Sequence, residues 1–93
     1  MDLVLNLKRE YFQEIKIGTK KEEYRLCTPY WQKRIEGKSF DRIIIKLGYP
    51  KSSEMDKILK FKWHGYQIKE ITHREFGNKP VKVYVIQLKE RIY

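Results

Sequence analysis

The segment from Gly18 to Arg25, GTKKEEYR, brings together side chains that can bind or act on an anion. Lys20 and Arg25 offer cationic donors to a phosphate, and Arg25 can donate two parallel hydrogen bonds. Glu23 can hold Arg25 in place, or it can accept hydrogen bonds from an amino group on a base edge, as carboxylates do with cytosine. The segment therefore predicts a basic nucleotide cleft, in which Lys20 and Glu23 are also the candidate catalytic residues.

The same residues also fit two interpretations without a ligand. Charged residues after a helix are common, and most surface charge contributes little. Alternatively, Glu23 and Arg25 form an ion pair that closes a barrel. The cleft is favoured because Glu23 and Arg25 share one face of an extended segment and Lys20 directly follows a glycine turn.

The elements that must position this segment follow from hydrophobic spacing. Residues 2–7 alternate between apolar and polar side chains, as a strand does. Residues 8–17 carry an apolar stripe at helical spacing, and Gly18 stands where a left-handed helix C-cap is expected. Residues 20–27 then return to an extended pattern, so the segment joins a helix to a strand.

A second helix is predicted after this strand. Thr28 is a natural N-cap, Pro29 fits the first helical position and Gly37 can end the helix. Trp31 and Ile35 are one turn apart and should face the core.

The second half of the chain reads as strands. Three consecutive isoleucines, residues 43–45, predict a central strand covered on both faces. Residues 57–71 predict one long strand bent at Gly65, and residues 81–89 the last strand. We therefore expect one α+β domain over residues 1–93: a small, partly open β-barrel of about five strands with two short flanking helices.

Composition favours a polyanionic partner. The chain has 93 residues, with 21 Lys and Arg against 12 Asp and Glu, and its net charge is +9. Basic excess together with aromatic side chains is typical of RNA- and nucleotide-binding proteins. Lys46, Tyr49 and Lys51, in and after the central strand, are further candidates for binding RNA. Tyr49 either stacks on a base or covers the end of the core.

The motif also resembles a known family. Gly18, Lys20, Glu23 and Arg25 fit a GxKxxExR pattern after LNLKREYFQEIKIG, and FDRIIIKLGYP and VKVYVIQL extend the similarity over essentially the whole chain. This resembles the ASCH domain, part of the PUA-like superfamily. The resemblance implies a small β-barrel with flanking helices that acts on RNA, either as a binding module or as a hydrolase of RNA or modified nucleosides.

Two enzymatic alternatives follow from the resemblance. Some ASCH relatives are amidohydrolases that remove an acetyl group from modified cytidine with a lysine, a threonine and a distant glutamate. Lys20 occupies the lysine position, but Glu23 replaces the threonine, and Glu75 is a candidate for the glutamate by location only. A ribonuclease is the other alternative, with Lys20, Glu23 and Tyr49 available for acid–base chemistry. Whether the protein is an enzyme stays open, and a protein-interaction module is the third functional class.

Other classes have little support in the sequence. Cys27 is the single cysteine, so no internal disulfide is possible, which fits a cytoplasmic protein. One cysteine and two scattered histidines do not make a metal motif, and no cofactor motif is present. No apolar run is long enough to predict a membrane span or a signal peptide.

Overall fold

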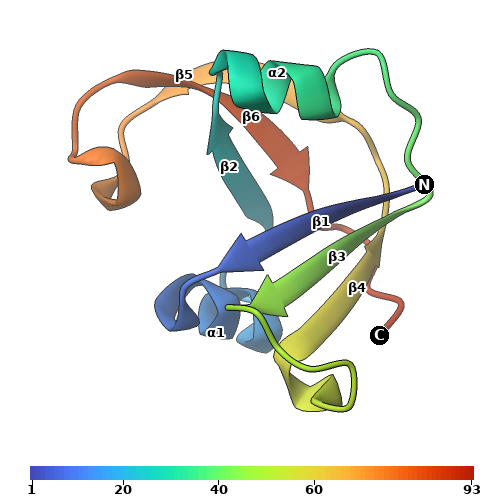
Figure 1. Ribbon diagram of the computed structural model, residues 1–93. Helices are drawn as coiled ribbons and strands as arrows, with labels where there is room; N and C mark the ends of the chain where they lie inside the picture. The colour runs from blue at the N-terminus through green and yellow to red at the C-terminus, as the bar shows by residue number, and fades with distance from the viewer.

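The computed structural model describes residues 1–93 as two three-stranded sheets with two α-helices (Figure 1). The first sheet has the order β1 (Asp2–Leu7), β3 (Arg42–Leu47), β4 (Ile58–Lys62). β3 is central, parallel to β1 and antiparallel to β4, and its three isoleucines are all buried. The prediction of a central strand covered on both faces is confirmed.

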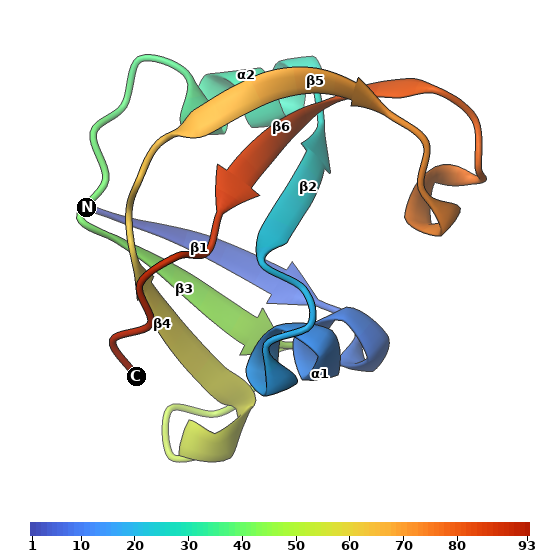
Figure 2. The same ribbon diagram turned by 180° about the vertical axis from the view of Figure 1, so that it is seen from behind.

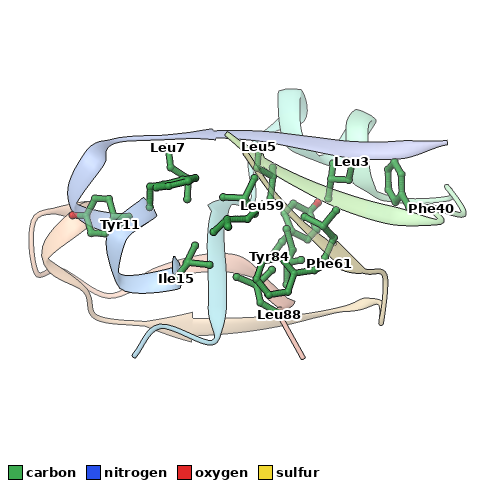
Figure 3. Packing of buried hydrophobic residues seen from close by; sticks show 14 of the residues in the cluster. Leu3, Leu5, Leu7, Tyr11, Ile15, Phe40, Leu59, Phe61, Tyr84 and Leu88 are labelled. Carbon is green, nitrogen blue, oxygen red and sulfur yellow. The ribbon is translucent and has the colours of Figure 1, made fainter. Parts of the chain in front are cut away.

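The second sheet has the order β2 (Glu22–Leu26), β6 (Val81–Gln87), β5 (Tyr66–Ile71), and both of its pairings are antiparallel. Figure 2 shows this sheet from behind, with α2 lying along it. The hydrophobic core fills the space between the two sheets (Figure 3). Strand alternation explains this, because one face of each strand turns toward the other sheet.

Helix α1 (Arg9–Ile17) lies at the carboxyl ends of β1 and β3 (Figures 1 and 2). Its apolar stripe of Tyr11, Phe12 and Ile15 is buried, as predicted. Burying a ring such as that of Phe12 contributes about 1.5–3 kcal/mol. Gly18 ends the helix at φ 89°, a left-handed conformation that glycine adopts without a steric penalty.

Helix α2 (Pro29–Ile35) begins as predicted. The Thr28 Oγ1 atom accepts a hydrogen bond from the Trp31 main-chain N–H at 3.3 Å, and Pro29 occupies the first turn. Ile35 is buried in the core, whereas Trp31 is only half-buried at its margin. With nine residues in α1 and seven in α2, neither helix has the length to cross a bilayer.

The structure corrects the predicted strands after Ile58 and does not confirm the barrel. The single bent strand is two strands in different sheets: β4 pairs with β3, and β5 pairs with β6. Gly65, at φ 81°, lies in the unpaired segment between them. A residue in the left-handed region departs from the extended conformation of a paired strand. The chain therefore has six strands in two separate sheets, and no closed barrel is found.

Candidate functional site: a buried carboxylate between two cations

Strand β2 turns Glu23 and Arg25 toward the core. In the β2–β6 register Glu23 lies opposite Ile86 and Arg25 opposite Tyr84, two residues that are themselves buried. The strand alternation predicted that Glu23 and Arg25 share a face, and this is confirmed. Glu23 is 0% exposed and is the one charged residue among the nineteen buried residues of the chain.

Glu23 holds two cations, one on each carboxylate oxygen. The Arg25 Nη2 atom donates a hydrogen bond to Glu23 Oε2 at 2.7 Å. The Lys20 Nζ atom lies 3.7 Å from Glu23 Oε1, within the range of an ion pair. The Lys20 and Arg25 side chains are only 10% and 17% exposed. We call these three residues the Glu23 cluster; with all three ionised it carries one net positive charge.

Arg25 is fixed from two further directions. Its Nη2 atom also donates to the main-chain carbonyl of Asn6 at 3.2 Å, and its guanidinium lies 4.9 Å over the Trp31 ring. Asn6 Nδ2 in turn donates to the Gly48 carbonyl at 2.6 Å. Because these contacts come from β1, α2 and the loop after β3, the position of the guanidinium depends on both sheets.

Lys20 is fixed by the turn that ends α1. The main-chain N–H of Lys20 donates to the Glu14 carbonyl at 3.0 Å, which returns the chain to the helix before β2 begins. The Lys20 Nζ atom lies 4.4 Å over the Tyr24 ring and 5.7 Å from the Tyr11 ring centroid. Two aromatic faces and one carboxylate thus stabilise a lysine that is nearly removed from water.

The electrostatics of the cluster are set by burial. Burial raises the pKa of the Glu23 carboxyl, and the positive charges of Arg25 and Lys20 oppose this only in part. The negative charge of Glu75 acts in the same direction as burial and raises the Glu23 pKa further. A carboxylate whose charge is disfavoured where it lies is a candidate for function, because such groups concentrate at binding and catalytic sites.

Three buried polar atoms around the cluster have no hydrogen-bond partner in the protein: Glu23 Oε1, Arg25 Nε and Glu75 Oε1. Buried polar atoms are nearly always paired, and ordered water is the usual partner where the protein supplies none. Glu23 Oε1 lies 3.7 Å from Lys20 Nζ, so a carboxylate and an ammonium group stand next to each other without a direct hydrogen bond.

Lys20 separates two open hollows. One, of about 440 Å³, is lined with polar and aromatic groups that include Tyr24, His73 and Arg74, and we call it the Lys20 hollow. The other, also of about 440 Å³, is lined by several lysines together with apolar residues such as Phe61 and Leu88. Lys20 and Lys21 line both hollows, whereas Glu23 and Arg25 line neither. The octapeptide thus borders concave surface, but its carboxylate and guanidinium lie behind that surface.

The structure does not bring Tyr49 to this cluster. Tyr49 is 93% exposed, so the alternative that it covers the core is wrong. It lines a separate hollow of about 390 Å³ with Lys8, Arg9 and Lys57. Tyr49 makes no contact with the cluster, but its neighbour Gly48 accepts a hydrogen bond from Asn6, which in turn contacts Arg25.

Lys46 and Lys51 also lie apart from the cluster. Lys46 lines a hollow of about 520 Å³ on the outer face of the first sheet, with Arg42 and Lys60. Lys51 is exposed in the following loop, where its main-chain N–H donates to Glu54 Oε1 at 2.9 Å. Of the six predicted binding residues, the structure places Lys20, Glu23 and Arg25 together and the other three elsewhere.

Sequence reasoning missed the residues that hold the cations. Trp31 appeared only as a core residue, and Asn6 and Tyr24 had no assigned role. Their signal is weak because it requires the spatial relation of β1 and α2 to β2, which no local pattern contains. Glu75, considered by location alone, lies close enough to Glu23 to affect its pKa.

Comparisons with known proteins give no further guide to this site. The chain matches no family model, no curated protein and no solved structure. Within the structure, no three His, Cys, Asp or Glu side chains are grouped as a metal ion would require.

Proposed function

We propose that the protein binds RNA or a nucleotide at the Glu23 cluster and the adjoining Lys20 hollow, as an ASCH-type domain would. The observation that carries the proposal is the buried Glu23 carboxylate held in ion pairs between Lys20 and Arg25, with no hydrogen bond to its Oε1 atom. A buried ion cluster contributes little net stability compared with apolar packing, so a role in binding accounts for it better. The net charge of +9 supports an anionic ligand.

The Lys20 hollow suits a ligand with both charge and a ring. Lys20 and Lys21 offer cations to phosphate, and Tyr24 and His73 offer ring faces and edges. Arg74, the third cation of the lining, is already paired with Glu10 and Glu14. The Tyr24 and His73 rings are 5.5 Å apart between centroids in an edge-to-face arrangement. A nucleotide presents phosphate and an aromatic base together, which matches this combination of groups.

Titration of a fluorescently labelled RNA of ten nucleotides, followed by anisotropy at about 50 and 200 mM salt, tests the proposal. We expect binding that weakens steeply with salt, because phosphate contacts release counterions. Lys20→Gln should weaken binding, whereas Lys79→Gln, the same charge change in the exposed turn before β6, should have a much smaller effect. Absence of binding by the wild-type protein at the lower salt concentration would rule the proposal out.

A hydrolase acting at the same cluster is the second candidate. It is favoured by the proximity of Glu23 to Lys20 and to Glu75, and by one buried oxygen on each of the two carboxyl groups that makes no hydrogen bond. Burial raises the pKa of Glu23, which is the direction that suits a general acid. In the amidohydrolase form of this idea, water attacks the amide carbonyl of an acetylated cytidine, the C–N bond breaks, and the cytidine amino group leaves with a proton, so that the products are acetate and cytidine.

Incubation of the purified protein with RNA and, separately, with acetylated cytidine tests the hydrolase. Turnover should depend on Lys20 and disappear in Lys20→Ala, while circular dichroism shows that the variant is folded. If neither substrate is consumed by the wild-type protein, the binding function remains and the hydrolase does not.

A further inference from the structure

A second surface with nucleic-acid chemistry lies beside α2. A hollow of about 600 Å³ lies between α2 and β1, and we call it the α2 hollow. Tyr30 stands at this hollow with 57% of its surface exposed. Residues lining the hollow are mainly apolar or basic and include Val4, Tyr30, Trp31, Lys33, Arg34 and Lys38.

The basic side chains of this hollow are not neutralised. Lys33, Arg34 and Lys38 form no ion pair with any carboxylate of the chain. The one carboxylate in the lining, Asp2, is already paired with Arg42 at 2.8 Å. Three cations beside an exposed ring thus leave a positive, partly apolar hollow, which is complementary to an anion with aromatic groups.

Helical spacing aligns these groups. Tyr30, Lys33 and Arg34 are separated by three and four positions in α2, so they lie on neighbouring turns of one face. The Arg34 guanidinium lies 4.2 Å over the Tyr30 ring, and the Tyr30 and Trp31 rings are 5.1 Å apart at 88°. Because Trp31 also contacts Arg25, two stacked cations with two rings between them connect this face to the Glu23 cluster.

We propose that the α2 hollow binds single-stranded nucleic acid, with Tyr30 stacking on a base and Lys33, Arg34 and Lys38 contacting phosphates. This inference rests on the proposed function and extends it to a second, separate set of residues. Unpaired bases expose the ring faces that Tyr30 can stack on, whereas the bases of a duplex are covered by their neighbours. An acidic peptide would use the three cations but would gain no stacking on Tyr30.

The test is anisotropy titration of the full chain with labelled ten-residue oligouridine and oligothymidine, a duplex RNA hairpin and an oligoglutamate peptide. We expect the single strands to bind more tightly than the hairpin and the peptide. Tyr30→Ala should weaken single-strand binding by about 5- to 150-fold, the range typical of losing one base–aromatic stack. Tyr30→Phe keeps the ring and should bind within about twofold of the wild type.

The contribution of Lys33, Arg34 and Lys38 is tested by measuring how the affinity for a single strand depends on salt concentration. Replacing Lys33, Arg34 and Lys38 with Gln together should lower the slope of log affinity against log salt by about 2, from roughly 0.7 for each lost contact with a single strand. A matched control replaces Lys69, Lys79 and Lys82, three exposed lysines of the β5–β6 region, with Gln. The control changes the net charge equally. In the control background, Tyr30→Ala should weaken single-strand binding by the same factor as it does in the wild type. Thermal melting confirms that each variant is folded.

Each outcome separates the two proposals. If the wild type binds RNA and Lys20→Gln weakens it, while Tyr30→Ala and the triple α2 variant bind as the wild type does, the α2 proposal is wrong and the proposed function stands. Tighter binding of the hairpin or the peptide also overturns it, the latter in favour of an acidic protein partner. If the wild type binds no nucleic acid at low salt, both proposals fail. Equal binding of the RNA and DNA strands fits the α2 proposal and indicates stacking without contacts to the 2′-hydroxyl.

Discussion

The protein contains two clusters of three charges with opposite arrangements. In the Glu23 cluster, one buried carboxylate lies between two cations. In the second, which we call the Arg74 cluster, one guanidinium lies between two carboxylates: Arg74 is 3.0 Å from both Glu10 and Glu14. The Arg74 side chain is 49% exposed, so water reaches the second cluster freely. The two clusters show what the solvent does to the same kind of interaction.

The direction of the pKa shift has opposite meanings in the two places. Hydrogen bonding to Glu14, with the negative charges of Glu14 and Glu10, raises the pKa of Arg74, which favours its charged form. Burial raises the pKa of Glu23, which favours its neutral form. At the surface the partners decide the balance, and in the interior the loss of water outweighs them. A buried charge lowers the stability of the folded state, so its presence indicates a function. An exposed charge has little such cost and can be present without a function.

The two clusters meet at Glu14. Its side chain accepts hydrogen bonds from Arg74, while its main-chain carbonyl accepts the N–H groups of Thr19 and Lys20 that close the turn after α1. The last turn of α1 therefore supports both clusters. Substitutions can still separate them, because one cluster depends on side chains in the interior and the other on side chains in water.

Glu23→Ala should have the largest effect of any substitution in these clusters. It leaves Lys20 and Arg25 without their carboxylate in a nearly waterless site and also opens a cavity. We expect the free energy of unfolding to fall by about 3–5 kcal/mol. Urea denaturation at neutral pH measures this fall. A loss no larger than that of an exposed glutamate, such as Glu70→Ala, would show that the cluster relaxes into water and is not a buried site.

Glu23→Gln should have a smaller effect, and one that depends on pH. The folded-state pKa of Glu23 is raised above its ordinary value of 4.5, so the folded protein binds this proton more tightly than the unfolded chain does. The stability from that proton is fully present below the ordinary value and is lost as the pH rises through the folded pKa. Gln cannot ionise but still accepts a hydrogen bond from Arg25.

Relative to the wild type, Glu23→Gln should therefore gain stability as the pH rises from about 4 toward neutrality. Denaturation of both proteins at four or five pH values in this window measures the difference. Parallel curves would mean that the two cations cancel the effect of burial, and a relative loss for Gln would mean that they exceed it.

The sequence predicts the local half of this arrangement well. The cap of α2, the glycine turn after α1 and the shared face of Glu23 and Arg25 all follow from spacing over a few residues. Local geometry determines these features, so residue type is enough: Thr28 accepts a hydrogen bond from the next turn, and Gly18 adopts the left-handed conformation.

The non-local half could not be predicted from the same patterns. Whether Glu23 is buried depends on how closely the two sheets approach, and the contacts of Arg25 come from Asn6 and Trp31, on other elements. Gly65 shows the same limit, since a glycine predicts a bend but not that the strands on either side join different sheets. Tyr49 lies on a loop whose direction depends on packing and not on its own sequence.

Gly18→Ala tests the Glu23 cluster through the main-chain turn that positions Lys20. Nothing lies within 4 Å of where the new Cβ atom would stand, so the cost comes only from the conformation at φ 89°. We expect the free energy of unfolding to fall by about 1–2 kcal/mol. Because this turn positions Lys20, RNA affinity should fall as well if the proposed site is correct. Gln13→Ala, on the exposed face of α1, is the control and should change neither quantity appreciably.

Arg74→Ala should have the smallest effect, although it removes the central ion of a cluster with two carboxylates. Each partner returns to water when the guanidinium is lost, so little interaction energy disappears with it. We expect a shift in melting temperature near the error of the measurement, and none in 1 M salt, where screening acts over about 3 Å. The loss in Glu23→Ala should persist in 1 M salt, because buried charges are screened much less. If 1 M salt removed the effect of Glu23→Ala as well, both clusters would be equally exposed to solvent. The Glu23 cluster would then not be the buried site that the proposed function requires.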